Sequence, residues 1–183
     1  QAEKRMLEGS EKMTDISSNS VTKALATAAD TERESFFGAT FPGLYAMMAK
    51  LHMHKFKTTE EQMALVSVKN HKNAMHNEYA HFHKEITVDE VLNSVKIADP
   101  LKILDSSPIT DGAAAVVLAS EEKARTLCDT PVWISGSGHA TDTISLHSRE
   151  DLLTLKATVE AARQAFLQAK LKPENIQVAE VHD

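Results

Sequence analysis

The sequence has one cysteine, Cys128, and few aromatic residues, which make up 5% of its 183 residues. A single cysteine excludes an intramolecular disulfide and favours a reducing compartment, so we expect a cytoplasmic protein. The sequence also lacks an apolar run of the roughly 18 residues that a membrane span requires. Residues 1–9 do not show the basic end and apolar stretch of a signal peptide. We therefore expect a soluble chain that does not enter a membrane.

An excess of basic residues is also missing. Lysine and arginine number 20 against 26 acidic residues, a formal net charge of -6, and the two signs are interspersed rather than gathered in blocks. Proteins that bind nucleic acid or an anionic membrane carry a basic patch or stripe, so we predict neither partner. The sequence does contain 42% apolar residues, which are enough to build a hydrophobic core in one or two domains.

The two ends of the sequence lack the usual marks of a complete protein. No methionine stands at the start, and the chain stops at Asp183 directly after the apolar-flanked run of residues 178–182. This abrupt end leads us to expect a piece of a longer protein.

The first half of the sequence predicts helices separated by loops. Residues 13–35 are rich in Ser, Thr, Asp and Ala with weak periodicity, which indicates an irregular or partly helical connection. Residues 36–43 form an aromatic loop interrupted by two glycines and a proline, and we predict a helix from Leu44.

Two further helices in this half carry capping signals. Thr58 or Thr59 is placed to cap a helix that starts near residue 60, and Gln62 stands at capping-box distance from Thr59. Thr87 is placed to cap a short helix that runs toward Val95. Both helices should begin where these side chains can accept backbone amides.

After Pro100 the pattern changes to alternating strands and helices, with a boundary near residues 100–112. A continuous apolar run at 113–119 suits a strand that is buried on both faces. Such alternation predicts a layered α/β unit behind the helical first half. The further elements predicted here are a helix opening at 120–124, a strand at 131–135, a long amphipathic helix at 151–170 and a strand at 176–181.

Three short sequence motifs stand out by their residues and by their order along the chain. Residues 9–14 read GSEKMT, residues 107–115 read SPITDGAAA and residues 180–183 read EVHD; between them, residues 69–74 read KNHKNA and residues 76–80 read HNEYA. Together they resemble the thiolase superfamily, and most closely its archaeal acetoacetyl-CoA thiolases and sterol-carrier-protein-type thiolases. The resemblance covers nearly the whole chain.

The resemblance implies the layered αβαβα thiolase fold, an α/β class, with a helical, loop-rich inserted domain. Residues 1–15 would end the N-terminal core half, residues 16–111 would form the loop domain, residues 112–130 would add the last strand and helix of that half, and residues 131–183 would start the C-terminal half. The chain departs from the family at Asn77-Glu78, where the family usually has Asn-Pro. Residues 4–8 are also polar for the buried strand that the family has there.

The implied chemistry is acyl transfer between CoA thioesters, with CoA thioesters as substrates and no resident cofactor. A thiolate takes the acyl group, and the carbanion of a second acyl-CoA attacks it. By the resemblance, the nucleophilic cysteines lie outside this chain, and we interpret Cys128 as structural. His182 would stabilise the enolate-like oxygen that forms, directly or through water; the alternative is a strand-end histidine bonded to a neighbouring loop.

Further positions match the family's contacts to the CoA arm. A tunnel for this arm should combine apolar walls with a few polar groups, although ordinary core packing or turn geometry would explain each residue as well. We assign Gly112 to a tight turn into the following strand, because glycine can adopt a left-handed backbone conformation without steric cost. The substrate-binding residues implied by the resemblance are Thr40, Phe41, Leu101, Ser107 and Ile109.

Nine histidines, six of them between His52 and His83, raise the alternative of a metal-binding module. None of the neighbouring pairs has the four-residue helical spacing of a metal site, and no cysteine accompanies them. We therefore predict no metal site.

Three functions remain open at this point. The first is an acetyl-CoA C-acetyltransferase, which condenses two acetyl-CoA molecules or runs the reverse thiolysis; the second is a non-catalytic thiolase-like subunit that binds acyl-CoA or a partner enzyme; the third is the metal module. The family implies homo-oligomers, a place in the mevalonate pathway of lipid metabolism, and partners that include hydroxymethylglutaryl-CoA synthase and a small scaffold protein. The isolated chain should fold poorly, because strands at 113–119, 132–135 and 176–181 would lack neighbours.

Overall fold

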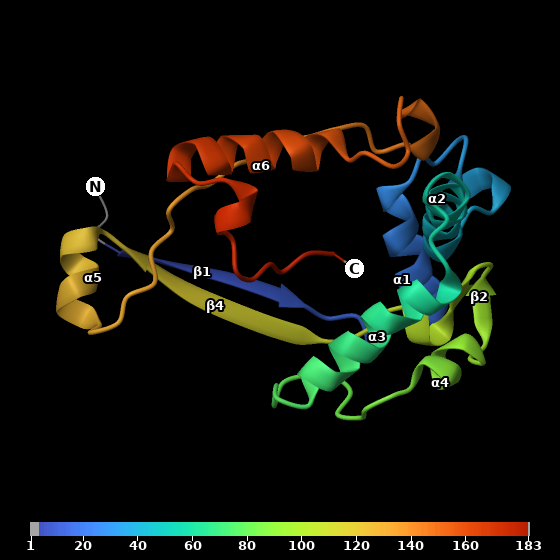
Figure 1. Ribbon diagram of the computed structural model, residues 1–183, viewed down its shortest axis with the longest axis horizontal. Helices are drawn as coiled ribbons and strands as arrows, with labels where there is room; N and C mark the ends of the chain where they lie inside the picture. The colour runs from blue at the N-terminus through green and yellow to red at the C-terminus, as the bar shows by residue number, and fades with distance from the viewer. Residues whose placement is uncertain (1–3, 183) are drawn as a thin grey trace. The chain divides into compact units, whose positions relative to one another are not determined.

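The computed structural model describes residues 4–182, which divide into two compact units (Figure 1). The first unit comprises the residues up to Ile16, then Ile109–Thr141 and Ala157–Ala179. The second comprises Ser17–Pro108, Asp142–Lys156 and the residues from Glu180 onward. The predicted loop domain, residues 16–111, has bounds close to the longest segment of the second unit and stays a prediction. Short 3₁₀ turns accompany the main elements: η1 (Ala26–Ala28), η2 (Ser35–Phe37), η3 (Ile103–Asp105), η4 (Leu146–Ser148) and η5 (Pro173–Asn175).

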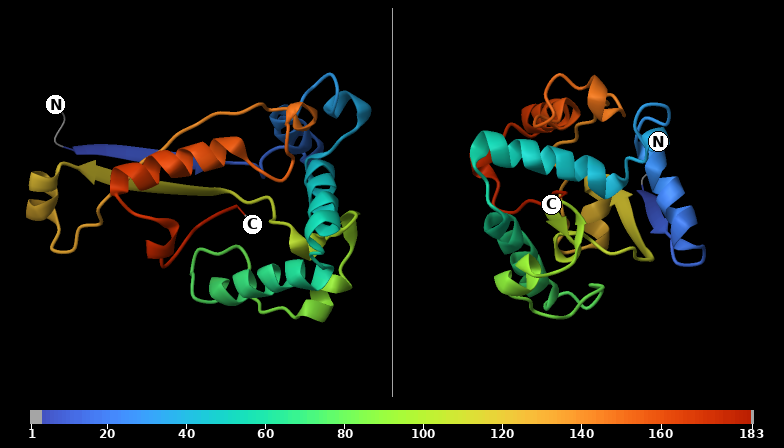
Figure 2. Two further views of the ribbon diagram at one scale, coloured as in Figure 1. Left: turned by 45° about the horizontal axis from the view of Figure 1, so that its top comes forward. Right: turned by 90° about the vertical axis from the view of Figure 1, so that its right-hand side faces the viewer.

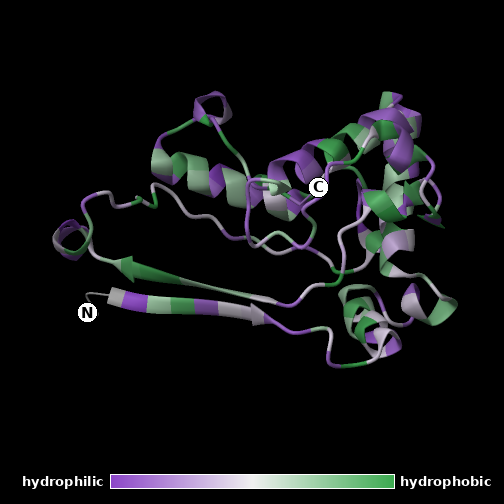
Figure 3. Cartoon of the chain, turned by 90° about the horizontal axis from the view of Figure 1, so that it is seen from below, coloured by the Kyte–Doolittle hydropathy of each residue, from purple (hydrophilic) through white to green (hydrophobic). Residues whose placement is uncertain are grey.

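In the first unit, strand β1 (Lys4–Glu11) pairs antiparallel with β4 (Gly112–Ala119). Figure 3 shows that β4 is apolar along most of its length, whereas β1 mixes polar and apolar residues. The strand predicted at 113–119 is therefore confirmed, but its burial on both faces is wrong: only Ala119 is partly covered. In the part of the chain that the structure describes, β1 is the one strand bonded to β4, so no second neighbour covers it.

Gly112 does not occupy the tight turn that we predicted for it. It is the first residue of β4 and is absent from the glycines with positive φ, which among the described residues comprise Gly38 alone, at φ 86°. The left-handed glycine therefore lies before the second helix of the chain and not before β4.

The remainder of the first unit is helical or extended. Helix α5 (Glu121–Leu127) follows β4 as predicted, and Ser120 caps it by accepting the amide of Lys123. Helix α6 (Lys156–Ala169) starts five residues later than predicted. Asp151 accepts hydrogen bonds from Leu153 N and Thr154 Oγ1, which close a turn before the helix.

The strands predicted at 131–135 and 176–181 are wrong, because neither segment joins a ladder in the described part of the chain. The backbone just after the first of them is bonded to helix α6 instead. Ser137 N donates to Gln168 Oε1 at 2.7 Å, and His139 N donates to Gln164 Oε1 at 3.3 Å. Glutamine side chains thus take amides that a neighbouring strand would otherwise accept.

The second unit carries the predicted helices. Helix α1 (Ser18–Leu25) lies in the connection predicted to be partly helical. Helix α2 (Phe41–Phe56) begins three residues before the predicted start, while α3 (Glu60–Ala74) and α4 (Val88–Leu92) begin as predicted. The predicted capping box of Thr59 with Gln62 is confirmed, and so is Thr87 as the cap of α4, where Glu90 completes a second capping box.

The core of this unit lies where α3 packs beside α4 (Figure 2). Ala64 and Val91 are fully buried there, and Ile86 beside them is 7% exposed. A short hairpin, β2 (Lys96–Ala98) and β3 (Leu101–Lys102), contacts α2. In the described residues, no helix is both long and apolar enough to cross a membrane.

Within the second unit, a buried carboxylate joins segment 142–156 to the segment around residues 30–34. Glu34 is 7% exposed, and its Oε1 accepts both the backbone amide and Nδ1 of His147, each at 3.1 Å. Its Oε2 accepts Asp30 N at 2.9 Å. Burial alone would raise the pKa of Glu34, but the hydrogen bonds from Asp30 and His147 hold it below its ordinary value. The carboxylate therefore stays charged and joins two distant segments.

Candidate functional site

The first turn of α2 is built by a left-handed glycine followed by a capping threonine. Gly38 at φ 86° ends the 3₁₀ turn η2, and Thr40 then caps the helix, its Oγ1 accepting Gly43 N at 3.2 Å. Pro42 fits the first turn, where its missing amide costs nothing. This local arrangement places Thr40 and Phe41, two predicted substrate-binding residues, at the start of the helix.

Three aromatic rings follow one another from this turn. Phe41 and Tyr45, one helical turn apart, have ring centroids 5.4 Å apart and planes tilted by 52°. The imidazole of His182 stacks on Tyr45, with ring centroids 5.4 Å apart and planes only 9° apart. The structure therefore brings together Phe41 and His182, which the sequence separates widely, through Tyr45.

Tyr45 was not among the predicted site residues. Its signal in the sequence is the spacing of four from Phe41, which places two aromatic rings on one helix face. The spacing gave no sign that His182 would lie against that face.

The other predicted residues do not join this stack. Leu101 is partly buried in β3, opposite Ala98 across the hairpin. Ser107 lies in an exposed loop. Ile109 is 41% exposed and belongs to the first unit. Asp183, next to His182, lies outside the described residues.

The stack offers two kinds of interaction to a ligand. An imidazole can donate an N–H to an oxygen that carries negative charge. Aromatic rings with partly exposed faces, such as Tyr45 at 39%, can pack against an apolar arm. The hydroxyl of Thr40 accepts one amide and still has its own proton to donate.

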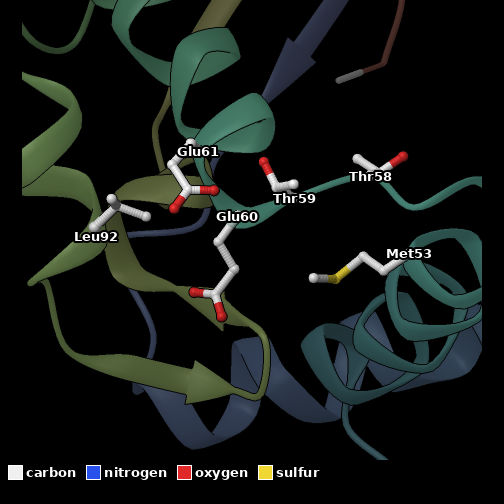
Figure 4. Close-up of a pocket in the computed structure, with 6 residues that line it drawn as sticks. All are labelled: Met53, Thr58, Thr59, Glu60, Glu61 and Leu92. Atoms are coloured by element: carbon white, nitrogen blue, oxygen red, sulfur yellow. The ribbon is translucent and has the colours of Figure 1, made fainter.

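A separate hollow of about 470 Å³ lies between the end of α2 and the start of α3. In Figure 4 the side chain of Met53 points toward Glu60 across it. Glu60 Oε2 is held by Lys102 Nζ at 2.9 Å, and hydrogen bonds at the helix start hold the pKa of Glu61 below its ordinary value. Two carboxylates make this hollow a poor place for the phosphates of CoA. It is lined by Met53, Thr58, Thr59, Glu60, Glu61 and Leu92.

The lone cysteine lies at the C-terminal end of a helix. Cys128 is exposed directly after the last residue of α5, and its Sγ lies 4.0 Å from Thr130 Oγ1. Reactive cysteines sit in electropositive settings such as a helix N-terminus or the vicinity of a cation, and the C-terminal end of a helix is the opposite setting. Among residues 4–182, the structure shows no group of three or more His, Cys, Asp or Glu side chains placed to hold a metal ion.

Comparisons with known proteins match the chain in two parts. Residues 1–122 match the family pattern of the thiolase N-terminal domain, and residues 138–183 match that of the thiolase C-terminal domain. The sequence is 53% identical over 175 residues to an acetyl-CoA acetyltransferase of Methanothermobacter thermautotrophicus and 45% identical over 177 residues to that of Methanocaldococcus jannaschii. Each alignment covers 96% of this chain and 45% of the relative, so the chain spans about half the length of these curated relatives.

Two solved structures share the fold of this chain. The chain is similar to a structure described as the Ltp2-ChsH2(DUF35) aldolase, with a TM-score of 0.73, 26% identity, and coverage of 95% of this chain and 46% of the other. A monomeric SCP2-thiolase-like protein from Mycobacterium smegmatis, with a TM-score of 0.66 and 20% identity over 95% of this chain and 37% of the other, shares the fold.

Proposed function

This chain belongs to the thiolase family, and from that premise we propose that it is part of an acetyl-CoA C-acetyltransferase. The reaction would be the Claisen condensation of two acetyl-CoA molecules or the reverse thiolysis. The observation that carries the proposal is the 53% identity to an archaeal acetyl-CoA acetyltransferase across 96% of this chain.

In this proposal His182 supports charge on the thioester oxygen. Deprotonating the second acyl-CoA moves negative charge onto that oxygen, and a preorganised N–H donor stabilises it more in the transition state than in the ground state. The stacked position of His182 on Tyr45 supports the assignment, because stacking holds the ring plane, and with it the N–H donor, in one orientation.

Other residues of the chain would bind the CoA arm. Thr40 and Phe41 would contact it at the start of α2, with Leu101 and Ser107 of the same unit forming further wall. The nucleophilic cysteine would lie outside this chain, because Cys128 follows a helix C-terminus rather than an electropositive site. CoA thioesters would be the substrates, with no resident cofactor.

Location and partners are also part of the proposal. We place the protein in the cytoplasm, as a homo-oligomer that serves the mevalonate pathway of lipid metabolism. A synthase of hydroxymethylglutaryl-CoA and a small scaffold protein would be its partners. The name of the similar aldolase joins two proteins, Ltp2 and ChsH2, which supports an assembly with a second kind of chain.

A second candidate is a non-catalytic thiolase-like subunit that binds acyl-CoA or a partner enzyme. It is favoured by the single cysteine of the sequence, whose position does not suit a nucleophile. On this alternative another chain would supply the cysteines.

The test starts from the natural polypeptide, meaning the product, whatever its length, that contains this chain in its source. Its intact mass is measured first, and thiolysis of acetoacetyl-CoA is then assayed. Replacing His182 with alanine should lower kcat by about 10²- to 10³-fold, the loss typical of an oxyanion donor. His54→Ala, an exposed histidine elsewhere on α2, should keep wild-type activity.

The two candidates give different results. A mass well above 20.1 kDa together with thiolase activity supports the acetyltransferase. A mass near 20.1 kDa, with activity only after a second protein is added, supports the non-catalytic subunit. Activity that His182→Ala leaves unchanged would remove His182 from the mechanism.

A further inference from the structure

The ring of His182, which carries the proposed oxyanion donor, stacks on the side chain of Tyr45. Residues 176–182 form neither helix nor strand beyond the turn that ends at Asn175, so backbone pairing does not set the direction of this side chain. The ring planes of His182 and Tyr45 lie within 9° of each other with centroids 5.4 Å apart, an offset stack of the kind that aromatic pairs prefer.

Tyr45 is well suited to fix another ring because its own position is fixed. It lies in the second turn of α2, with Phe41 against its ring and the buried Ala46 next to it in the sequence. The same helix also contacts the β2–β3 hairpin, where Lys50 is 2.8 Å from Asp99 in the hairpin turn. Tyr45 therefore offers a ring face to His182 from a helix that is capped at its start by Thr40 and packed against the β2–β3 hairpin.

From this geometry we infer that Tyr45 is a positioning residue for His182: its ring face fixes the plane of the imidazole so that an N–H points at the thioester oxygen. This inference rests on the function proposed above. Donor groups for a developing oxyanion act fully only when they are held within about 10–20° of the productive direction. A ring free to rotate would still bind substrate but would align less often.

The role belongs to the ring of Tyr45 and not to its hydroxyl. Stacking uses the face of the ring, which phenylalanine shares, whereas a hydroxyl that contacted substrate would be lost in Tyr45→Phe. Leucine keeps apolar bulk without a flat face. The pair Tyr45→Phe and Tyr45→Leu therefore separates stacking from packing and from hydrogen bonding.

The chain offers a matched control. Its other tyrosine, Tyr79, is 87% exposed and lies after the end of α3, away from the stack. Tyr79→Leu makes the same chemical change and should leave the kinetics unchanged.

Two measurements on the natural polypeptide test the inference. The first is the kinetics of acetoacetyl-CoA thiolysis. We expect Tyr45→Leu to lower kcat by about 10- to 100-fold, the cost of a small misplacement, with KM within about twofold of wild type. Tyr45→Phe should match wild type in both constants.

The second measurement is the proton NMR spectrum of the histidine rings, with the His182 signals identified by their loss in His182→Asn. A ring stacked on Tyr45 has its proton signals shifted upfield by the ring current. The shift should persist in Tyr45→Phe and disappear in Tyr45→Leu. A merely structural role for Tyr45 would not move these signals together with kcat.

The outcomes separate this inference from the proposed function. Wild-type activity in Tyr45→Leu overturns the inference and leaves the proposed function standing, and equal losses in Tyr45→Phe and Tyr45→Leu overturn it in favour of the hydroxyl. Absence of thiolysis in the wild-type polypeptide overturns the proposed function and the role of Tyr45 with it. Should Tyr45→Leu melt below the assay temperature, Tyr45→Met takes its place under the same criteria.

Discussion

Asp111 and Thr14 stand 97 positions apart, yet the Asp111 carboxylate accepts both the backbone amide of Thr14, at 3.0 Å, and its hydroxyl, at 2.5 Å. Met13 N adds a third hydrogen bond at 2.7 Å, and Lys12 Nζ lies 3.4 Å away. The chain leaves β1 through residues 12–14 and returns to β4 after Asp111. One side chain therefore ties the departing and returning strands together at the point where the second unit is inserted.

Replacing Asp111 with asparagine should lower the melting temperature by a few degrees at neutral pH, because an uncharged amide is a weaker acceptor than a carboxylate. The hydrogen bonds from Thr14 and Met13 hold the pKa of Asp111 well below its ordinary value. A depressed folded pKa gives stability that is fully present above the unfolded value, near 3.9, and is lost as the pH falls through the folded value.

The pH series provides the check. Melting temperatures of wild type and Asp111→Asn should differ most at pH 7, and the difference should begin to shrink as the pH falls below about 4. Asp129→Asn, an exposed aspartate after α5, controls for the change in net charge and should follow wild type throughout. A difference that grows toward acid would contradict the assigned role.

Lys102 is the largest fully buried side chain of the described residues. Its Nζ donates to Glu60 Oε2 at 2.9 Å and to Pro100 O at 3.1 Å, and it lies 3.0 Å from Asp105 Oδ2. Burial alone would lower the pKa of Lys102, but its hydrogen bonds to Glu60 and Asp105 raise it above the ordinary value. The charged lysine thereby joins the β2–β3 hairpin to the start of α3.

Lys102→Met should reduce the free energy of unfolding by about 3–5 kcal/mol, because it leaves the carboxylate of Asp105, only 4% exposed, without its cation. Urea denaturation of the natural polypeptide measures the loss. Lys96→Met removes an exposed lysine paired with Asp99 in the same hairpin and should cost far less. Equal losses in the two variants would show that the buried ion pair contributes no more to the free energy of unfolding than the exposed one.

The features that the sequence predicted well are local ones. The capping boxes of Thr59 and Thr87 each involve residues three positions apart, so their hydrogen bonds depend on the nearby sequence alone. The strand at 113–119 was also found, but its exposure was not, because burial depends on what lies beside a strand. For the same reason the apolar segments 131–135 and 176–181 were wrongly predicted as strands.

The candidate site also contains features set by the nearby sequence and features set by contacts between distant segments. Thr40 and Phe41 were predicted in the loop before a helix at Leu44, whereas they lie at the helix start itself, where capping within one turn sets their geometry. The stack of His182 on Tyr45 joins residues from two ends of the chain, and no pattern within either segment encodes it. The left-handed glycine was assigned to Gly112 instead of Gly38, because a glycine before a strand can equally start the strand in extended conformation.

The 183-residue chain made alone should fold poorly. A compact protein of 20.1 kDa exposes about 8,700 Å², and two compact bodies of half that mass about 10,500 Å², whereas this chain exposes 14231 Å². Val116 and Val117 of β4 are 55% and 63% exposed. We expect strong binding of a hydrophobic dye and a broad thermal transition by circular dichroism; a sharp cooperative melt without dye binding would contradict this.

Two glycines let the segment after residue 135 approach the backbone of α6. A Cβ built on Gly136 would overlap the carbonyl oxygen of Ala165 and stand 3.1 Å from Ala169 Cβ. A Cβ on Gly138 would overlap the carbonyl oxygen of Ala161. Both obstacles include helix backbone, which cannot move aside as the tip of a flexible side chain can. The two amides that Gln164 and Gln168 accept flank Gly138, so the close approach and the hydrogen bonds require each other.

Gly138→Ala should therefore destabilise the natural polypeptide by about 3 kcal/mol or more, at or above the upper end for overpacking, because the segment must leave the helix and lose both glutamine bonds. Gly112→Ala is the matched control: its new Cβ would meet no atom within 4 Å, and its φ is not positive. Alanine there should be neutral or stabilising by up to about 1 kcal/mol, since glycine loses more conformational freedom on folding. Urea denaturation compares the two variants, and a Gly138→Ala protein as stable as Gly112→Ala would mean that the segment does not rest on α6 in solution.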